Sequence, residues 1–112
     1  MSGKFSRNKG AAHERRVCRI LIDAGYEARR NLTQYQETTG RDVTTNLPLC
    51  IQCKAGQKID ARKAFAEAVS AAESHEWPVA WLHVTNGPKM VVLDEEHFEA
   101  MLLQGFLVGG RP

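Results

Sequence analysis

The segment from Asp42 to Lys54 constrains the fold of this chain more than any other part of the sequence. Its first residues, 42–45, are rich in β-branched side chains, which favour strands. Asn46-Leu47-Pro48 is typical of a turn, and the apolar run 49–54 suits a second strand. The segment therefore predicts a β-hairpin whose second strand carries two polar residues, Gln52 and Lys54, near its end.

The rest of the chain shows alternating helix and strand patterns. Apolar residues recur at spacings of three and four from Gly10 to Ala24, which indicates an amphipathic helix, and Gly25 suits its C-terminal cap. Asp60 and Asp94 suit helix N-caps. We expect helices over 10–24, 60–74 and 94–103, and strands over 26–32, 42–45, 49–54, 79–84 and 90–93. We also expect Pro78 to precede the fourth strand, and Phe98, Met101 and Leu102 to face inward from the last helix.

The resulting order, α-β-β-β-α-β-β-α, is that of an α/β fold with a central mixed sheet flanked by helices. The 112 residues are enough for one domain with one modest core. Residues 1–9 form a basic segment that we expect to be a flexible arm, and residues 105–112 a loose tail. Because no apolar run is long enough to cross a membrane and no secretory signal is evident, we expect a cytoplasmic protein.

Charge is distributed unevenly along the sequence. Up to Lys63 there are 13 Lys and Arg residues against 6 Asp and Glu, whereas from Ala64 onward there are 2 against 7. A basic half of this kind indicates a face that binds a polyanion such as a nucleic acid.

The three cysteines, Cys18, Cys50 and Cys53, form an odd set in a chain without an export signal, so we expect no disulfides. Cys50 and Cys53 have a zinc-like spacing. However, structural zinc normally needs four Cys or His ligands, and no second closely spaced pair follows. On a strand, these two side chains also point to opposite faces. A zinc site is therefore a weak hypothesis.

The polar residues of the hairpin point to metal chemistry. Alternation along the strand puts Cys50, Gln52 and Lys54 on one face, where Asp42 of the neighbouring strand can lie beside Gln52. Carboxylate and amide oxygens are ligands that Mg²⁺ accepts. A lysine next to such a site can orient a nucleophilic water and offset charge on a phosphate.

With these residues the chain resembles the PD-(D/E)xK nuclease superfamily, and in particular the archaeal and phage Holliday junction resolvases. The resemblance covers roughly residues 6–103. It rests on a first helix opened by Lys9-Gly10-Ala11-Ala12-His13-Glu14-Arg15-Arg16, on a loop before Asp42, and on Gln52-Cys53-Lys54 at the end of a strand. It implies a restriction-endonuclease-like core in a homodimeric, Mg²⁺-dependent endonuclease that acts on branched DNA, with Mn²⁺ able to substitute. The expected location becomes the cytoplasm of a prokaryotic cell or a phage-infected host.

The resemblance also assigns roles to individual residues. Glu14, Asp42, Gln52 and Lys54 would be catalytic. The metal would be held by Asp42, Gln52, Glu14 and the main-chain carbonyl of Cys53. DNA phosphates would be contacted by Lys9, Arg15, Arg16, Arg30 and Arg41. Two positions depart from the family pattern, because Arg41 replaces a proline and Gln52 replaces a glutamate, which removes one negative charge from the metal site.

Several alternatives stay open at this point. The chain could be a phage-type nuclease with another task, such as nicking or DNA packaging. It could also be a non-catalytic DNA-binding module of the same fold, because the acid at position 52 is missing. The weak zinc hypothesis would make it an interaction protein. Asn31 and Gln34, which flank the predicted loop, are further candidates for DNA contact.

Overall fold

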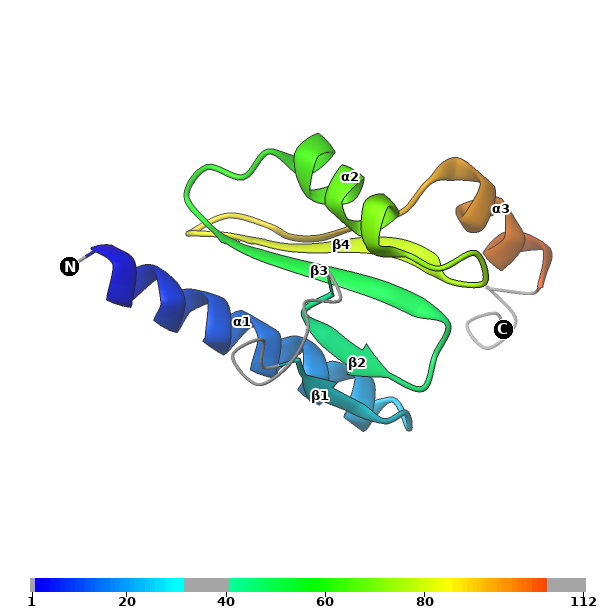
Figure 1. Cartoon of the computed structure of the whole chain (residues 1–112), viewed down its shortest axis with the longest axis horizontal. Helices are drawn as coiled ribbons and strands as arrows, with labels where there is room; N and C mark the ends of the chain where they lie inside the picture. The colour runs from blue at the N-terminus through cyan, green and yellow to red at the C-terminus, as the bar shows by residue number, and fades with distance from the viewer. Residues whose placement is uncertain (1, 32–40, 105–112) are drawn as a thin grey trace, which may run out of the picture.

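The computed structural model describes residues 2–31 and 41–104, with side chains from residue 9 onward, and its elements follow the predicted order. The helices are α1 (Ser2–Asp23), α2 (Ala61–Ala71) and α3 (Glu95–Leu103). The strands are β1 (Ala28–Arg30), β2 (Val43–Thr45), β3 (Leu49–Gly56), β4 (Trp77–Val84) and β5 (Lys89–Val92). Figure 1 shows their arrangement.

The five strands form one mixed sheet in the order β1-β2-β3-β4-β5. β3 and β4 are parallel and pair along their whole length, from Leu49 opposite Trp77 to Gly56 opposite Val84, whereas the other neighbours are antiparallel. A parallel pair needs a crossover connection, and α2 supplies it. The predicted mixed sheet flanked by helices is confirmed.

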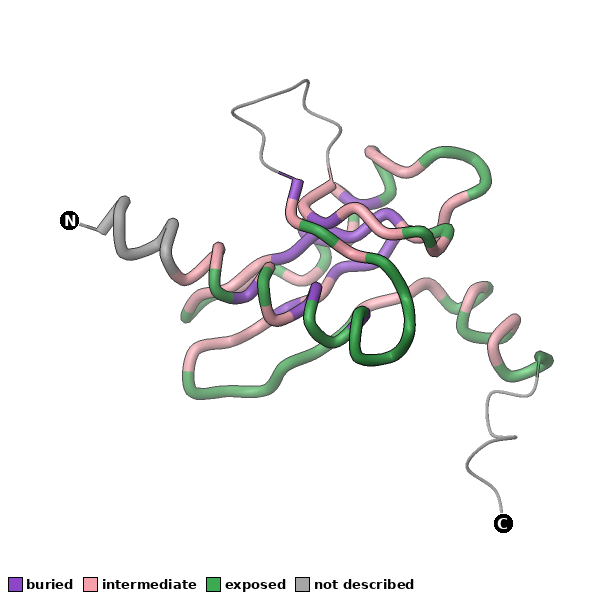
Figure 2. The backbone as a smooth tube through the Cα atoms, turned by 90° about the horizontal axis from the view of Figure 1, so that it is seen from below, coloured by how far each residue is buried: buried purple, intermediate pink, exposed green. Residues whose placement is uncertain are grey.

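Helices cover the two faces of this sheet (Figures 1 and 2). α1 packs through Val17 and Leu21 against Ile51 and Val79. α2 packs through Ala64 against Ala80 and Leu82, the neighbouring positions on the opposite face. Because side chains alternate along a strand and both faces are covered, β3 and β4 carry apolar residues on both faces, and Gln52, Lys54 and His83 are the polar exceptions.

The predicted helix ends are confirmed where their capping chemistry is local. Gly25 has φ +102°, and the N–H groups of Gly25 and Tyr26 bond to the carbonyls of Ile22 and Leu21 at 2.9 and 3.0 Å, which is a Schellman motif. The Asp60 and Asp94 side chains accept hydrogen bonds from the backbone N–H groups of Lys63 and His97.

Pro78 was predicted to precede the fourth strand, and this prediction is wrong, because the residue lies inside β4. The Trp77 N–H donates to the carbonyl of Pro48, on the side of β4 that faces β3. Because backbone groups alternate in direction along a strand, the nitrogen of Pro78, which carries no hydrogen, faces the opposite side of β4. β5 pairs with β4 only from Ala80 onward. The proline therefore occupies a place where β4 is still an edge strand, which is where sheets tolerate it.

Two other predictions are wrong at the ends of the described chain. α1 begins at Ser2 rather than Gly10, so the segment expected to be a flexible arm is helical from that residue. α3 contains no buried residue, and the side chains of Phe98 and Leu102, predicted to face inward, are 46% and 47% exposed. The predicted loop 34–40 and the tail 105–112 lie outside the described residues. No helix within the described ranges is both long and apolar enough to cross a membrane.

Candidate active site

Asp42 lies at the bend where β2 begins, beside the middle of β3. Its carboxylate Oδ2 accepts a 2.8 Å hydrogen bond from the backbone N–H of Cys53, and its own N–H bonds to the carbonyl of Ile51 at 2.9 Å. The carboxylate thus takes the place of a backbone acceptor at the point where β2 and β3 stop pairing. Its position is fixed by backbone rather than by flexible side chains.

The protonation of Asp42 is perturbed by its surroundings. Burial raises the pKa of its carboxyl group. The Cys53 N–H and the charge of Lys54 oppose this change, whereas the negative charge of Glu67 adds to it. Residues from β3 and α2 therefore lie within electrostatic reach of Asp42. A partly buried carboxylate with a raised pKa is typical of a functional position.

The side chains of Gln52 and Lys54 leave β3 on the face covered by α2, as alternation predicts. Gln52 is buried, with 7% of its surface exposed. The N–H and C=O groups of one strand residue point to the same side. The Cys53 carbonyl therefore faces the same edge as the N–H that binds Asp42, which agrees with its predicted role.

An acidic residue that the sequence did not suggest completes this face. Glu67 of α2 forms an ion pair with Lys54, with Oε1 and Nζ 2.9 Å apart. Both residues line a cavity of about 280 Å³ at the end of β3, whose wall also contains Lys58 and Lys63. The cavity therefore combines three lysines with the carboxylates of Glu67 and Asp60, and Asp42 lies within electrostatic reach of Glu67 and Lys54.

Glu14 approaches the same region from α1. Its Oε1 accepts a 3.0 Å hydrogen bond from Nε of Arg30 in β1. Burial raises the pKa of Glu14, the bond from Arg30 opposes the shift, and the charge of Asp42 adds to it. The structure thus places Glu14 within electrostatic reach of Asp42, as predicted, but pairs it with an arginine that was expected to contact DNA.

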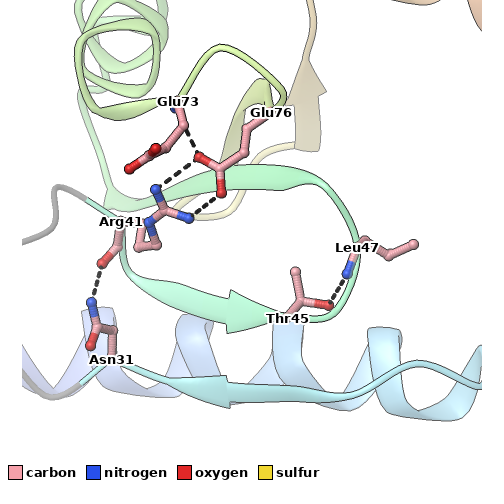
Figure 3. A network of polar contacts seen from close by, with 6 residues as sticks. All are labelled: Asn31, Arg41, Thr45, Leu47, Glu73 and Glu76. Carbon is pink, nitrogen blue, oxygen red and sulfur yellow. Dashed lines mark hydrogen bonds and ion pairs between the residues drawn. The ribbon is translucent and has the colours of Figure 1, made fainter.

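Arg41 is also paired rather than free to contact phosphate. Its Nη1 and Nη2 donate to the two carboxylate oxygens of Glu76 at 2.6 and 2.8 Å, and both side chains are mostly buried (Figure 3). Asn31, a candidate for DNA contact, is itself buried and donates from Nδ2 to the carbonyl of Arg41 at 3.0 Å. This hydrogen bond joins residues 31 and 41. Gln34 lies outside the described residues.

The other three basic candidates lie on α1. Arg15 is exposed, whereas Lys9 and Arg16 line a second cavity together with His13 and His83. His13 is only 2% exposed. The sequence did not indicate a role for His13, because a single histidine on a helix forms no motif. The one available signal was its spacing of three residues from Arg16, which places both side chains on the same side of α1.

The oxygen donors near Asp42 fit a hard divalent cation. Asp42 and Glu67 are carboxylates, and Gln52 and the Cys53 carbonyl add neutral oxygens. Within the described residues no three His, Cys, Asp or Glu side chains lie together as a metal cluster. Mg²⁺ does not require one, because it is commonly held by one or two carboxylates, with waters and substrate phosphates completing the octahedron.

The spacing of α2 could have revealed Glu67. It lies three residues after Ala64 and one before Ala68, the two buried positions of the helix, so it borders the face that packs on the sheet. Its meeting with Lys54 depends on where α2 crosses β3, which the spacing alone does not specify.

Comparisons with known proteins leave the family of this chain open. A scan against protein-family models, a search of curated proteins and a search of solved structures each returned no match.

Proposed function

We propose that this chain is a metal-dependent endodeoxyribonuclease with a restriction-endonuclease-like core, which hydrolyses phosphodiester bonds in branched DNA such as a four-way junction. One observation carries the proposal. The Asp42 carboxylate is fixed by the backbone of Cys53, within electrostatic reach of the Lys54–Glu67 pair. A carboxylate that can hold a metal ion, close to a lysine that can stabilise negative charge on a phosphate, supports phosphodiester hydrolysis.

The donor set gives each residue a role. Asp42, Glu67, Gln52 and the Cys53 carbonyl would hold Mg²⁺ or Mn²⁺, with Glu14 close enough to orient a water. When bound, the metal supplies an activated water and stabilises negative charge on the phosphate. Lys54 would donate hydrogen bonds to the attacking water or to the phosphate, and Lys58 and Lys63 would attract the DNA backbone into the cavity.

Glu67 offsets the departure at position 52. Gln52 supplies an oxygen without a charge, and the Glu67 carboxylate restores the second negative charge on the same face of β3. Two carboxylates are within the range that magnesium sites use. The proposal therefore does not depend on Gln52 behaving as an acid.

A homodimer would provide the two active sites that a symmetric four-way junction requires. The structure offers a surface for it. α3 and the edge strand β5 expose Met90, Val91, Phe98, Leu102 and Leu103. Phe98→Glu, on the exposed face of α3, should convert a dimer into a monomer in analytical ultracentrifugation. A wild-type monomer at micromolar concentration would refute this part of the proposal.

The cleavage experiment uses labelled four-way-junction and linear duplexes of identical sequence, incubated with Mg²⁺ or Mn²⁺. We expect the junction to be cut preferentially. Lys54→Ala should reduce the rate by roughly 100-fold or more while leaving junction binding in EDTA unchanged. Arg29→Ala, at an exposed arginine of β1 outside the proposed dimer surface, is the matched control.

The second candidate is a non-catalytic DNA-binding module. It is favoured by the neutral Gln52 and by the pairing of Lys54 with Glu67, which occupies the lysine. Tight junction binding without cleavage under either metal would establish it and refute the nuclease proposal.

A further inference from the structure

A second cavity lies on the α1 face of the sheet, and of its described lining residues only Ala55 also lines the cavity that contains Lys54 and Glu67. This second cavity has a volume of about 370 Å³, within the range of sites for small ligands. Lys9, His13 and Arg16 of α1 form one wall, and His83 of β4 with Thr85 form the other. None of the described residues that line it is acidic.

His13 holds the arginine of this cavity in place. Its Nε2 lies 2.8 Å from the carbonyl oxygen of Trp81, and because a carbonyl can only accept, Nε2 carries the hydrogen. The neutral ring then presents Nδ1 as an acceptor, and Arg16 Nη2 lies 3.3 Å from it. The buried imidazole is therefore a positioning residue that directs the guanidinium of Arg16 toward the cavity.

Several positive groups lie close together around the cavity, and their charges act on its two histidines. Burial lowers the pKa of His13, and the charges of Arg16 and His83 lower it further. Burial together with Lys89, Arg16 and Lys9 lowers the pKa of His83. In addition, the buried Nε of Arg16 has no hydrogen-bond acceptor among the described residues. A buried donor on a charged group is costly to leave unpaired, and an anion would satisfy it.

We infer that this cavity binds a phosphate group, with Arg16 as the main charged donor. Lys9, whose Nζ donates to the Thr85 hydroxyl oxygen at 3.4 Å, adds positive charge at the cavity wall. Ala55 lines both this cavity and the one that contains Lys54 and Glu67, so the two open on either side of the end of β3. The phosphate could belong to a nucleic acid strand or to a free anion. Only the first source rests on the proposed nuclease function.

The test follows the imidazole NMR signals of His83 and His13 in metal-free buffer with EDTA, so that cleavage does not interfere. Inorganic phosphate is titrated first, and a short linear DNA duplex second. We expect a saturable shift of the His83 signals with phosphate. Arg16→Gln should raise the phosphate dissociation constant roughly ten-fold or more, the effect of losing one charge-assisted hydrogen bond.

Arg19→Gln is the matched control, because Arg19 is exposed on the same helix and does not line the cavity. It should leave the dissociation constant unchanged. If the amide spectrum shows that Arg16→Gln is unfolded, Lys9→Gln at the cavity wall replaces it, with the same expected direction. The absence of a saturable shift, or equal affinities of wild type and the folded cavity variant, overturns the inference.

The DNA titration identifies the source of the phosphate. If the duplex shifts the same His83 signals and phosphate competes with it, the site takes a backbone phosphate. If phosphate binds and the duplex leaves His83 unmoved, the site takes a free anion. A chain that fails to cut DNA but binds phosphate through Arg16 loses only the nuclease proposal, whereas a chain that cuts DNA without any response of His83 loses only this inference.

Discussion

Lys54 of β3 and Glu67 of α2 form an ion pair with Nζ and Oε1 2.9 Å apart, across the crossover that connects the two parallel strands. The two side chains are 41% and 38% exposed, so the pair contributes at most about 1 kcal/mol to stability. A contribution to stability of this size is a weak reason for an acid and a base to lie within electrostatic reach of Asp42. A role in the candidate active site accounts for it better.

Glu67→Gln should therefore reduce cleavage far more than stability. The change removes one negative charge from the proposed metal site and keeps the size of the side chain. We expect a loss of activity of roughly 10-fold to 100-fold, as for groups that support a metal. Junction cleavage rates and thermal denaturation measure the two effects. Glu99→Gln on α3 is the control, and equal activity of the two variants would exclude Glu67 from the site.

Gln52→Glu should tighten metal binding, because it adds a carboxylate to a site with oxygen donors. Without metal the buried charge should lower the midpoint of thermal unfolding, and Mn²⁺ should restore it through preferential binding to the folded state. Calorimetric titration with Mn²⁺ measures the affinity. Gln57→Glu, an exposed position after β3, serves as the control. An unchanged Mn²⁺ affinity would show that position 52 is not a ligand.

Asp42→Asn should abolish cleavage without lowering stability at pH 7. Burial raises the pKa of this carboxyl, so the folded state favours its neutral form, and the charge destabilises the fold above the raised pKa. Asparagine retains an oxygen that can accept from the Cys53 N–H. The unfolding midpoint should equal or exceed that of wild type at pH 7, and the advantage should shrink as the pH falls through the raised pKa and the wild-type carboxyl becomes protonated. A large loss of stability at pH 7 would assign Asp42 a structural role.

Arg41→Ala should destabilise the fold by about 2 kcal/mol, between the values for exposed and buried ion pairs. It leaves the carboxylate of Glu76 without its two donors. Denaturant unfolding measures the loss, and Arg29→Ala, an exposed arginine of β1, should change stability little. A double variant with Glu76→Ala should be less destabilised than the sum of the two single changes. Additive effects would show that the pair contributes no coupling energy.

His13 should make stability sensitive to mild acid. Burial lowers its pKa below the ordinary value of 6.5, so the unfolded chain binds a proton that the folded chain does not. Stability is then fully present above about pH 6.5 and decreases as the pH falls below it. His13→Gln should reduce the difference between unfolding midpoints at about pH 7.5 and about pH 5.5. His75→Gln, at an exposed histidine, should leave that difference unchanged; an equal slope in both variants would contradict the prediction.

The local elements were predictable because their signals lie within a few neighbouring residues. The hairpin around Asn46-Leu47-Pro48, the glycine cap at Gly25 and the N-caps at Asp60 and Asp94 each follow from short-range geometry. Two of the predictions that failed, those for Pro78 and for α3, concern elements whose state depends on distant partners. Pro78 is tolerated in β4 because β5 begins to pair only later, and Phe98, Leu102 and Leu103 of α3 are not covered by the part of the chain that the structure describes.

By itself, the sequence determined the order of helices and strands, and it placed Gln52 and Lys54 on one face of the strand that follows Asp42. Strand alternation fixes these relationships whatever the rest of the chain does. Only the tertiary structure decided which charges meet. The packing of α2 across β3 brings Glu67 to Lys54, and the approach of α1 to β4 brings His13 to the Trp81 carbonyl. Such pairs depend on the position at which a helix crosses the sheet, and residue spacing does not encode that position.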